Sequence, residues 1–99
     1  MSENLTRDAF AEQLNTKFYI HFTPEAATEA ELVEVTELKK IYVQESFSVF
    51  FLAPLEPQFE QRIYQIEHSQ LGAFELFLVA VNRKENGIKY EAVFNRLTE

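Results

Sequence analysis

Residues 62–82, with the sequence RIYQIEHSQLGAFELFLVAVN, decide the class of fold. Apolar and polar side chains alternate through residues 62–68, and this period of two is typical of a strand that buries one face. Residues 69–72 have the composition of a turn, and residues 73–82 then resume the period. The two predicted inward faces carry Tyr64, Ile66 and His68 on the first strand and Phe74, Leu76, Leu78 and Ala80 on the second. Because the turn is short, we expect these strands to be antiparallel neighbours.

The same period of two recurs elsewhere in the chain. It predicts further strands at residues 17–23, 31–38, 47–53 and 88–95. Residues 41–43 either continue the strand before them or begin another one. Residues 25–30 are predicted to form a loop, because this stretch is short and carries no apolar face. Asn86-Gly87 is a strong signal for a tight hairpin before the last strand.

Helical spacing occurs only near the N-terminus, in residues 6–14. Thr6 is suited to cap this helix, and Leu5 and Phe10 occupy the two apolar positions that flank such a cap. With connections too short for helical crossovers, the chain is predicted to be mainly β: a small antiparallel barrel of six to seven strands, or a folded-over sheet, with one short N-terminal helix. We expect residues 1–99 to form one domain.

The composition is dominated by aromatic rings. Ten of the 99 residues are Phe and four are Tyr, and there is no Trp. We interpret these rings as the core, with an aromatic-lined ligand cavity as the alternative. Cys is absent, which excludes a disulfide, a cysteine nucleophile and any zinc site that uses Cys.

The net charge of −7 argues against polyanionic partners. No more than two basic residues are neighbours, whereas a nucleic acid or an anionic membrane requires several converging cations. The N-terminal residues are polar without the apolar stretch of a secretion signal, and the longest apolar run, residues 76–81, is far shorter than a membrane span. We therefore expect a cytoplasmic protein that binds neither nucleic acid nor membrane.

No catalytic, cofactor or metal site is predicted. Glu67 and His68 are adjacent on a strand and so point to opposite faces. We expect His68 to bond a turn carbonyl at a strand end and His21 to lie at the surface or an edge. These two histidines and either Glu67 or Glu75 are residue types that can bind a metal ion, but they lack the usual spacing of metal ligands. The serines have no nucleophile-elbow context, so we expect no enzyme.

Two stretches are candidate interaction surfaces. The acidic run that includes Glu29, Glu31, Glu34 and Glu37 contains no basic residue, and is expected to form a solvated edge or a docking surface for a basic partner. Phe77, Val79 and Val81 make the second face of a strand apolar as well. Because an exposed apolar face is unusual in a soluble monomer, we expect either another subunit or the apolar side of the N-terminal helix, formed by Leu5, Phe10 and Leu14, to cover it, and we favour the helix.

Four segments together resemble a family of small bacterial domains of unknown function. They are ELVEVTEL (31–38), SFSVFFLAPL (46–55), RIYQIEHSQLGAFELFLVAVNR (62–83) and YEAVFNR (90–96), and the resemblance covers about residues 5–96. Some members are encoded beside proteins that resemble phage tail-collar adhesins. The resemblance implies a standalone structural or assembly domain, and it carries over no activity, ligand or catalytic residue.

The sequence therefore favours a non-catalytic protein-interaction or assembly module, associated with phage-tail-like structures through the resemblance alone. Its expected partner is another protein or a second copy of the chain. The alternative is a small-ligand barrel in which some aromatic rings line a cavity. A barrel interior that is filled with side chains would favour the first function.

Overall fold

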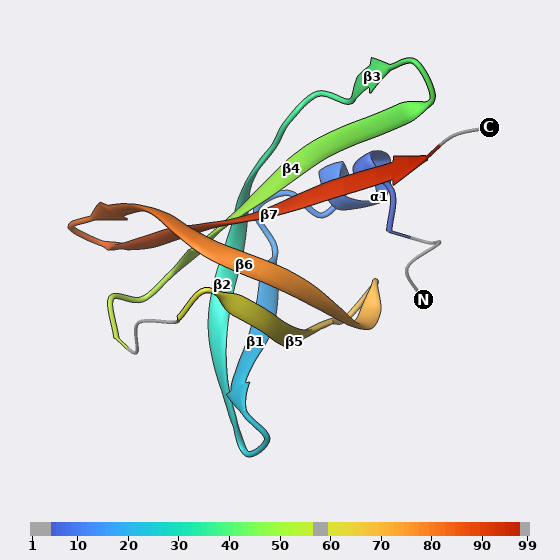
Figure 1. The fold of residues 1–99 in the computed structure, drawn as a ribbon. Helices are drawn as coiled ribbons and strands as arrows, with labels where there is room; N and C mark the ends of the chain where they lie inside the picture. Colours follow the sequence, from blue (N-terminus) through green and yellow to red (C-terminus); the bar gives the residue numbers. More distant parts are fainter. Residues whose placement is uncertain (1–4, 57–59, 98–99) are drawn as a thin grey trace.

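The computed structural model describes residues 5–56 and 60–97 (Figure 1). Its elements, in chain order, are α1 (Arg7–Ala11), β1 (Lys17–Thr23), β2 (Ala26–Val35), β3 (Lys39–Ile41), β4 (Gln44–Ala53), β5 (Arg62–His68), β6 (Gly72–Lys84) and β7 (Gly87–Leu97). The predicted strands are confirmed except at residues 36–38, since β2 ends at Val35, and residues 41–43 are resolved into the end of a separate strand, β3, and a turn.

The seven strands form one antiparallel sheet that closes on itself. The strand order is β2-β1-β5-β6-β7-β4-β3, and an additional pairing of β2 with β4 completes a ring of six strands. β3 stays outside the ring and pairs only with β4. The predicted class, a small antiparallel barrel with one short N-terminal helix, is confirmed.

The prediction of a loop at residues 25–30 is wrong. β2 begins at Ala26, and its register sets Thr28 opposite Ile20 and Ala30 opposite Phe18. Both small residues are buried, since a small side chain fits beside a large one in the wall of a narrow barrel. The pairing partner therefore determines the first half of this strand, which has no large apolar side chain of its own.

Bulges interrupt the period of two at three points. The register shifts at Phe22 in β1, at Val33 in β2 and at Val81 in β6, where one strand carries an extra residue. A bulge bends a strand and increases its twist, which closing a small barrel requires. Beyond Leu78, β6 runs on in a ribbon with β7, and Ala80, predicted to face inward, is exposed there.

The helix closes one end of the barrel. Thr6 caps it as predicted, accepting a hydrogen bond at Oγ1 from the Ala9 amide at 3.1 Å. Phe10 is fully buried, with its ring centroid 5.3–6.4 Å from those of Phe18, Phe47, Phe74 and Phe94 on four strands. The helix ends at Ala11 instead of residue 14, because the chain must turn to bring the Asn15 amide to the Leu32 carbonyl at 2.7 Å.

Candidate interaction surface

Large apolar side chains gather on the outside of β5, β6 and β7. Ile63 of β5 pairs directly with Phe77 of β6, and the two are 61% and 48% exposed. Val79 follows Phe77 on the same side of β6 and pairs with Glu91 of β7, two residues before the exposed Val93. We call this surface, made of Ile63, Phe77, Val79, Val81 and Val93, the apolar wall.

The expectation that the N-terminal helix covers Phe77, Val79 and Val81 is wrong. The helix places Leu5 and Phe10 in the core on the inner side of the sheet, whereas Leu14 lies beyond its end and is 40% exposed. The predicted apolar side of the helix is confirmed for Leu5 and Phe10 and wrong for Leu14, and the two buried residues pack against the core rings at the barrel end. Within the described residues, Phe77 and Val81 remain exposed and Val79 is half-buried.

The predicted acidic residues do not form a sheet edge, because β2 is paired with β1 on one side and with β4 on the other. Glu29 lies 3.6 Å from Lys17, Glu34 lies 3.0 Å from Lys89, and Glu37 lies 3.6 Å from Arg7. Glu31 is half-buried, and it pairs with Lys17 of β1 on one side and with Leu52 of β4 on the other. Three of the four carboxylates thus already face a cation of the same chain, which weakens this strip as a site for a basic partner.

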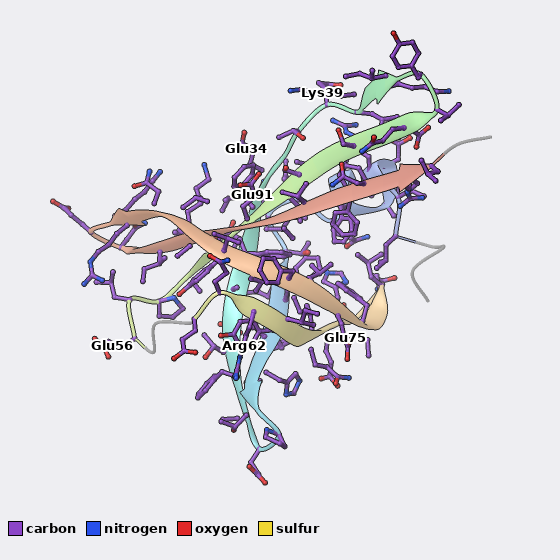
Figure 2. The ribbon with its side chains drawn as sticks, in the orientation of Figure 1. Glu34, Lys39, Glu56, Arg62, Glu75 and Glu91 are labelled. Carbon is purple, nitrogen blue, oxygen red and sulfur yellow. The ribbon has the colours of Figure 1, made fainter. Side chains whose placement is uncertain are left out.

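A polar network lies next to the apolar wall on β2, β4 and β7. Glu34 and Glu91 flank Phe50 in the two registers. Figure 2 shows these two glutamates near the crossing of the strands. The Lys89 ammonium lies 4.8 Å from the centre of the Phe50 ring, and the Ser48 hydroxyl donates to Glu91 at 2.8 Å. These paired polar side chains form a rim on one side of the apolar wall.

His68 is a structural residue at the β5–β6 turn. Its Nδ1 accepts hydrogen bonds from the amides of Gln70 at 3.0 Å and Leu71 at 3.2 Å, and its Nε2 lies 2.9 Å from the Thr16 hydroxyl. Two amide donors at Nδ1 require its lone pair, so the ring proton lies on Nε2 and is donated to Thr16. Burial lowers the pKa of His68, in keeping with a neutral ring. The ring therefore caps the turn, but through amide groups instead of the predicted carbonyl.

His21 lies on the outer face of the barrel, whereas His68 is buried. The buried Nε2 of His21 lies 3.2 Å from Glu67 Oε1 without forming a hydrogen bond. The pair borders a surface hollow of about 460 Å³ that also includes Phe22, Pro24 and Gln65. The two histidines therefore cannot share a metal ion, and no cluster of three or more potential ligands occurs in the described part of the chain.

The interior is filled by aromatic and aliphatic side chains. Phe10, Phe18 and Phe51 are fully buried, and successive ring centroids along this row are 6.3 and 5.1 Å apart. Phe47 and Phe94 stack at 4.7 Å with nearly parallel planes. Rings in mutual contact favour the interpretation of these Phe residues as core over that of a ligand cavity, whereas Phe50 and Phe77 lie on the outer surface.

A second exposed apolar region was not identified from the sequence. It lies around the β3–β4 turn, where Ile41 and Tyr42 are 67% and 94% exposed and Val43 and Leu38 are also exposed. The available signal was the triplet Ile-Tyr-Val at residues 41–43, which occupies a turn without any of the residues that turns prefer.

Comparison with known proteins identifies the family. Within residues 5–56 and 60–97, no helix is long and apolar enough to cross a membrane. No curated protein and no solved structure was found to match the chain. A family model described as a domain of unknown function, DUF6916, matches residues 5–94, nearly the whole chain. The chain that presents this apolar wall on a closed six-stranded barrel therefore belongs to the DUF6916 family.

Proposed function

We propose that this chain is a non-catalytic protein-interaction module whose partner packs on the apolar wall. The supporting observation is that Ile63 and Phe77, direct neighbours on adjacent strands, are both about half exposed or more. Contiguous exposed apolar surface with a polar rim is typical of protein-binding sites. The N-terminal helix, the one helix among the described residues, packs against the end of the barrel and does not cover the apolar wall.

The filled interior supports this function over small-ligand binding. A ligand site requires a concave cavity that can enclose most of its ligand. Here the inward positions of all six ring strands contribute to one contiguous core, together with Leu5 and Phe10. A binding function therefore depends on the outer surface.

An association with phage-tail-like assemblies rests on the sequence resemblance alone. The apolar wall is compatible with that role, because it presents a fixed surface on a rigid barrel. The identity of the partner is to be found experimentally.

The experiment compares the wild-type chain with Phe77→Asp and, as a matched control, Leu14→Asp. Both substitutions replace a 40–50% exposed apolar side chain by a carboxylate, so neither should lower the stability by more than about 1 kcal/mol. Each tagged chain is used for affinity capture from cells that produce it, followed by quantitative mass spectrometry. We expect a protein that the wild type and Leu14→Asp retain and Phe77→Asp loses. Identical captured proteins for all three would contradict the proposal.

A further inference from the structure

The β3–β4 hairpin forms an arm outside the closed barrel. β3 pairs with β4 from Lys39–Ser46 to Ile41–Gln44, and it has no second neighbouring strand in the part of the chain that the structure describes. Figure 1 shows the arm at the end of the molecule opposite to the β1–β2 turn. The molecule is elongated, with extents of 41 × 26 × 23 Å.

The tip of this arm, residues 38–44, has features that are energetically unfavourable in an isolated domain. Tyr42 is 94% exposed and has a φ of 57°, in the left-handed region that bulky side chains rarely adopt. Ile41 and Val43 beside it are exposed, and so is Leu97, the residue of β7 that pairs with Gln44. Backbone strain together with an exposed apolar turn is typical of a functional contact, because neither feature stabilises the barrel.

The charge of the tip is opposite to that of the rest of the protein. The paired hairpin, residues 39–46, includes Lys39, Lys40 and, opposite Lys40, Glu45, so it carries +1. Since the whole chain carries −7, its remaining residues carry −8. The tip is therefore electrostatically complementary to the body of another copy of the same chain.

This distribution selects one orientation between two copies. A tip-to-tip contact would bring the lysines of both copies together, and lysines on an edge strand also oppose strand-to-strand pairing. A body-to-body contact would oppose two acidic surfaces. We propose that the arm tip of one copy docks on the acidic barrel of a second copy, in a head-to-tail arrangement.

The hollow beside His21 and Glu67 is the acceptor that fits the tip. Phe22 and Pro24 give it an apolar lining, and the half-exposed Glu67 provides a carboxylate for a lysine of the tip. Its volume of about 460 Å³ leaves room for a small aromatic group such as the Tyr42 ring. It includes Thr23 and Pro24 at the β1–β2 turn, far from the arm of the same chain.

Because donor and acceptor lie on different surfaces of one chain, the contact is heterologous. Such a contact does not close on itself and adds copies one after another. The purified protein should therefore form oligomers whose mean mass rises with concentration. This inference does not depend on the apolar wall, which remains free in each copy.

The test uses a donor variant, Tyr42→Asn, and an acceptor variant, Glu67→Lys. Asn tolerates a positive φ, so the turn is preserved while the ring is removed. Circular dichroism and thermal unfolding verify that both chains fold, and Lys39→Glu is a second donor variant. Sedimentation velocity over a wide concentration range should show association for the wild type and monomers for each variant. An equimolar mixture of Tyr42→Asn and Glu67→Lys should form heterodimers and no larger species, because one functional donor and one functional acceptor remain.

Three outcomes would overturn the inference. They are a wild type that stays monomeric at every concentration, single variants that associate like the wild type, and a mixture that stays monomeric. The control is Ile63→Asp in the apolar wall, which should associate like the wild type. If Ile63→Asp abolished association, the apolar wall would be the contact instead of the tip. Failure of this test leaves the capture experiment on Phe77 unaffected, so the two proposals are judged separately.

Discussion

Replacing His68 by Leu should lower the free energy of unfolding more than a typical single substitution does. The ring accepts from the amides of Gln70 and Leu71 and is bonded to the Thr16 hydroxyl, which in turn donates to the Gln13 carbonyl at 2.7 Å. It thereby ties the β5–β6 turn to the turn that precedes β1. Leu has a similar size but offers no polar atom, so all three bonds to the ring are lost.

The magnitude follows from those three bonds. Each hydrogen bond contributes roughly 1 kcal/mol net, which gives a loss of about 3 kcal/mol for His68→Leu. His68→Asn is the informative comparison, because its side-chain oxygen can still accept from amides two and three residues ahead. It should lose the bond to Thr16 and the contact with the Phe18 ring, 4.1 Å from the His68 ring, or about 1.5 kcal/mol.

Urea unfolding measures these differences, with His21→Leu as the control at the other histidine. For a domain of this size, the loss in His68→Leu corresponds to a decrease in melting temperature of roughly 12 °C or more. His21→Leu removes a side chain whose Nε2 makes no hydrogen bond, and should cost less than about 1 kcal/mol. A His68→Leu chain within about 0.5 kcal/mol of the wild type would refute the assignment of His68 as a turn-capping residue.

Three further predictions concern the same fold. Because burial lowers the pKa of His68 in the folded state, its contribution to stability is fully present above the unfolded pKa of about 6.5 and is lost as the pH falls below that value. The urea midpoint of the wild type should therefore decrease more on acidification than that of His68→Asn. Parallel decreases in the two chains would contradict this. Phe10→Ala should lower the free energy of unfolding by about 3–5 kcal/mol, measured by urea titration, since it removes a fully buried ring from among four others. Gly87→Ala should cost more than about 1 kcal/mol in calorimetry, because a Cβ there would lie 2.5 Å from the Ala53 carbonyl oxygen; an unchanged melting temperature would show that β4 can shift away.

Periodicity predicted most of the strands but not the closure of the barrel. The alternation in residues 62–82 predicts β5, its turn and β6, because most of the inward side chains there, such as Ile66, Phe74 and Leu78, are large and apolar. Closure depends on the pairing of β2 with β4, which includes Leu32 opposite Phe51, and no local pattern indicates that long-range contact. The start of β2 is hidden for the same reason, since Thr28 and Ala30 are buried by their partners and not by their own hydrophobicity.

The candidate surface was predicted in part. Phe77, Val79 and Val81 were identified because both faces of β6 are apolar, and the structure places this second face outward. The covering element was predicted wrongly, since sequence alone shows that a helix has an apolar side but not which cavity that side fits. The exposure of Tyr42 depends on a hairpin that projects from the barrel, which follows from the position of β3 outside the ring.

The central claim, that the apolar wall is open in the free chain and covered by a protein partner, is tested most directly by photo-crosslinking in cells. A photoreactive phenylalanine analogue is introduced at Phe77 and, in a separate chain, at Leu14, two positions of similar exposure on different parts of the surface. Irradiation of cells that produce the protein should yield a discrete, heavier adduct with one protein from position 77 and no such adduct from position 14. The absence of any adduct at position 77, or the same adducts from both positions, would contradict the account.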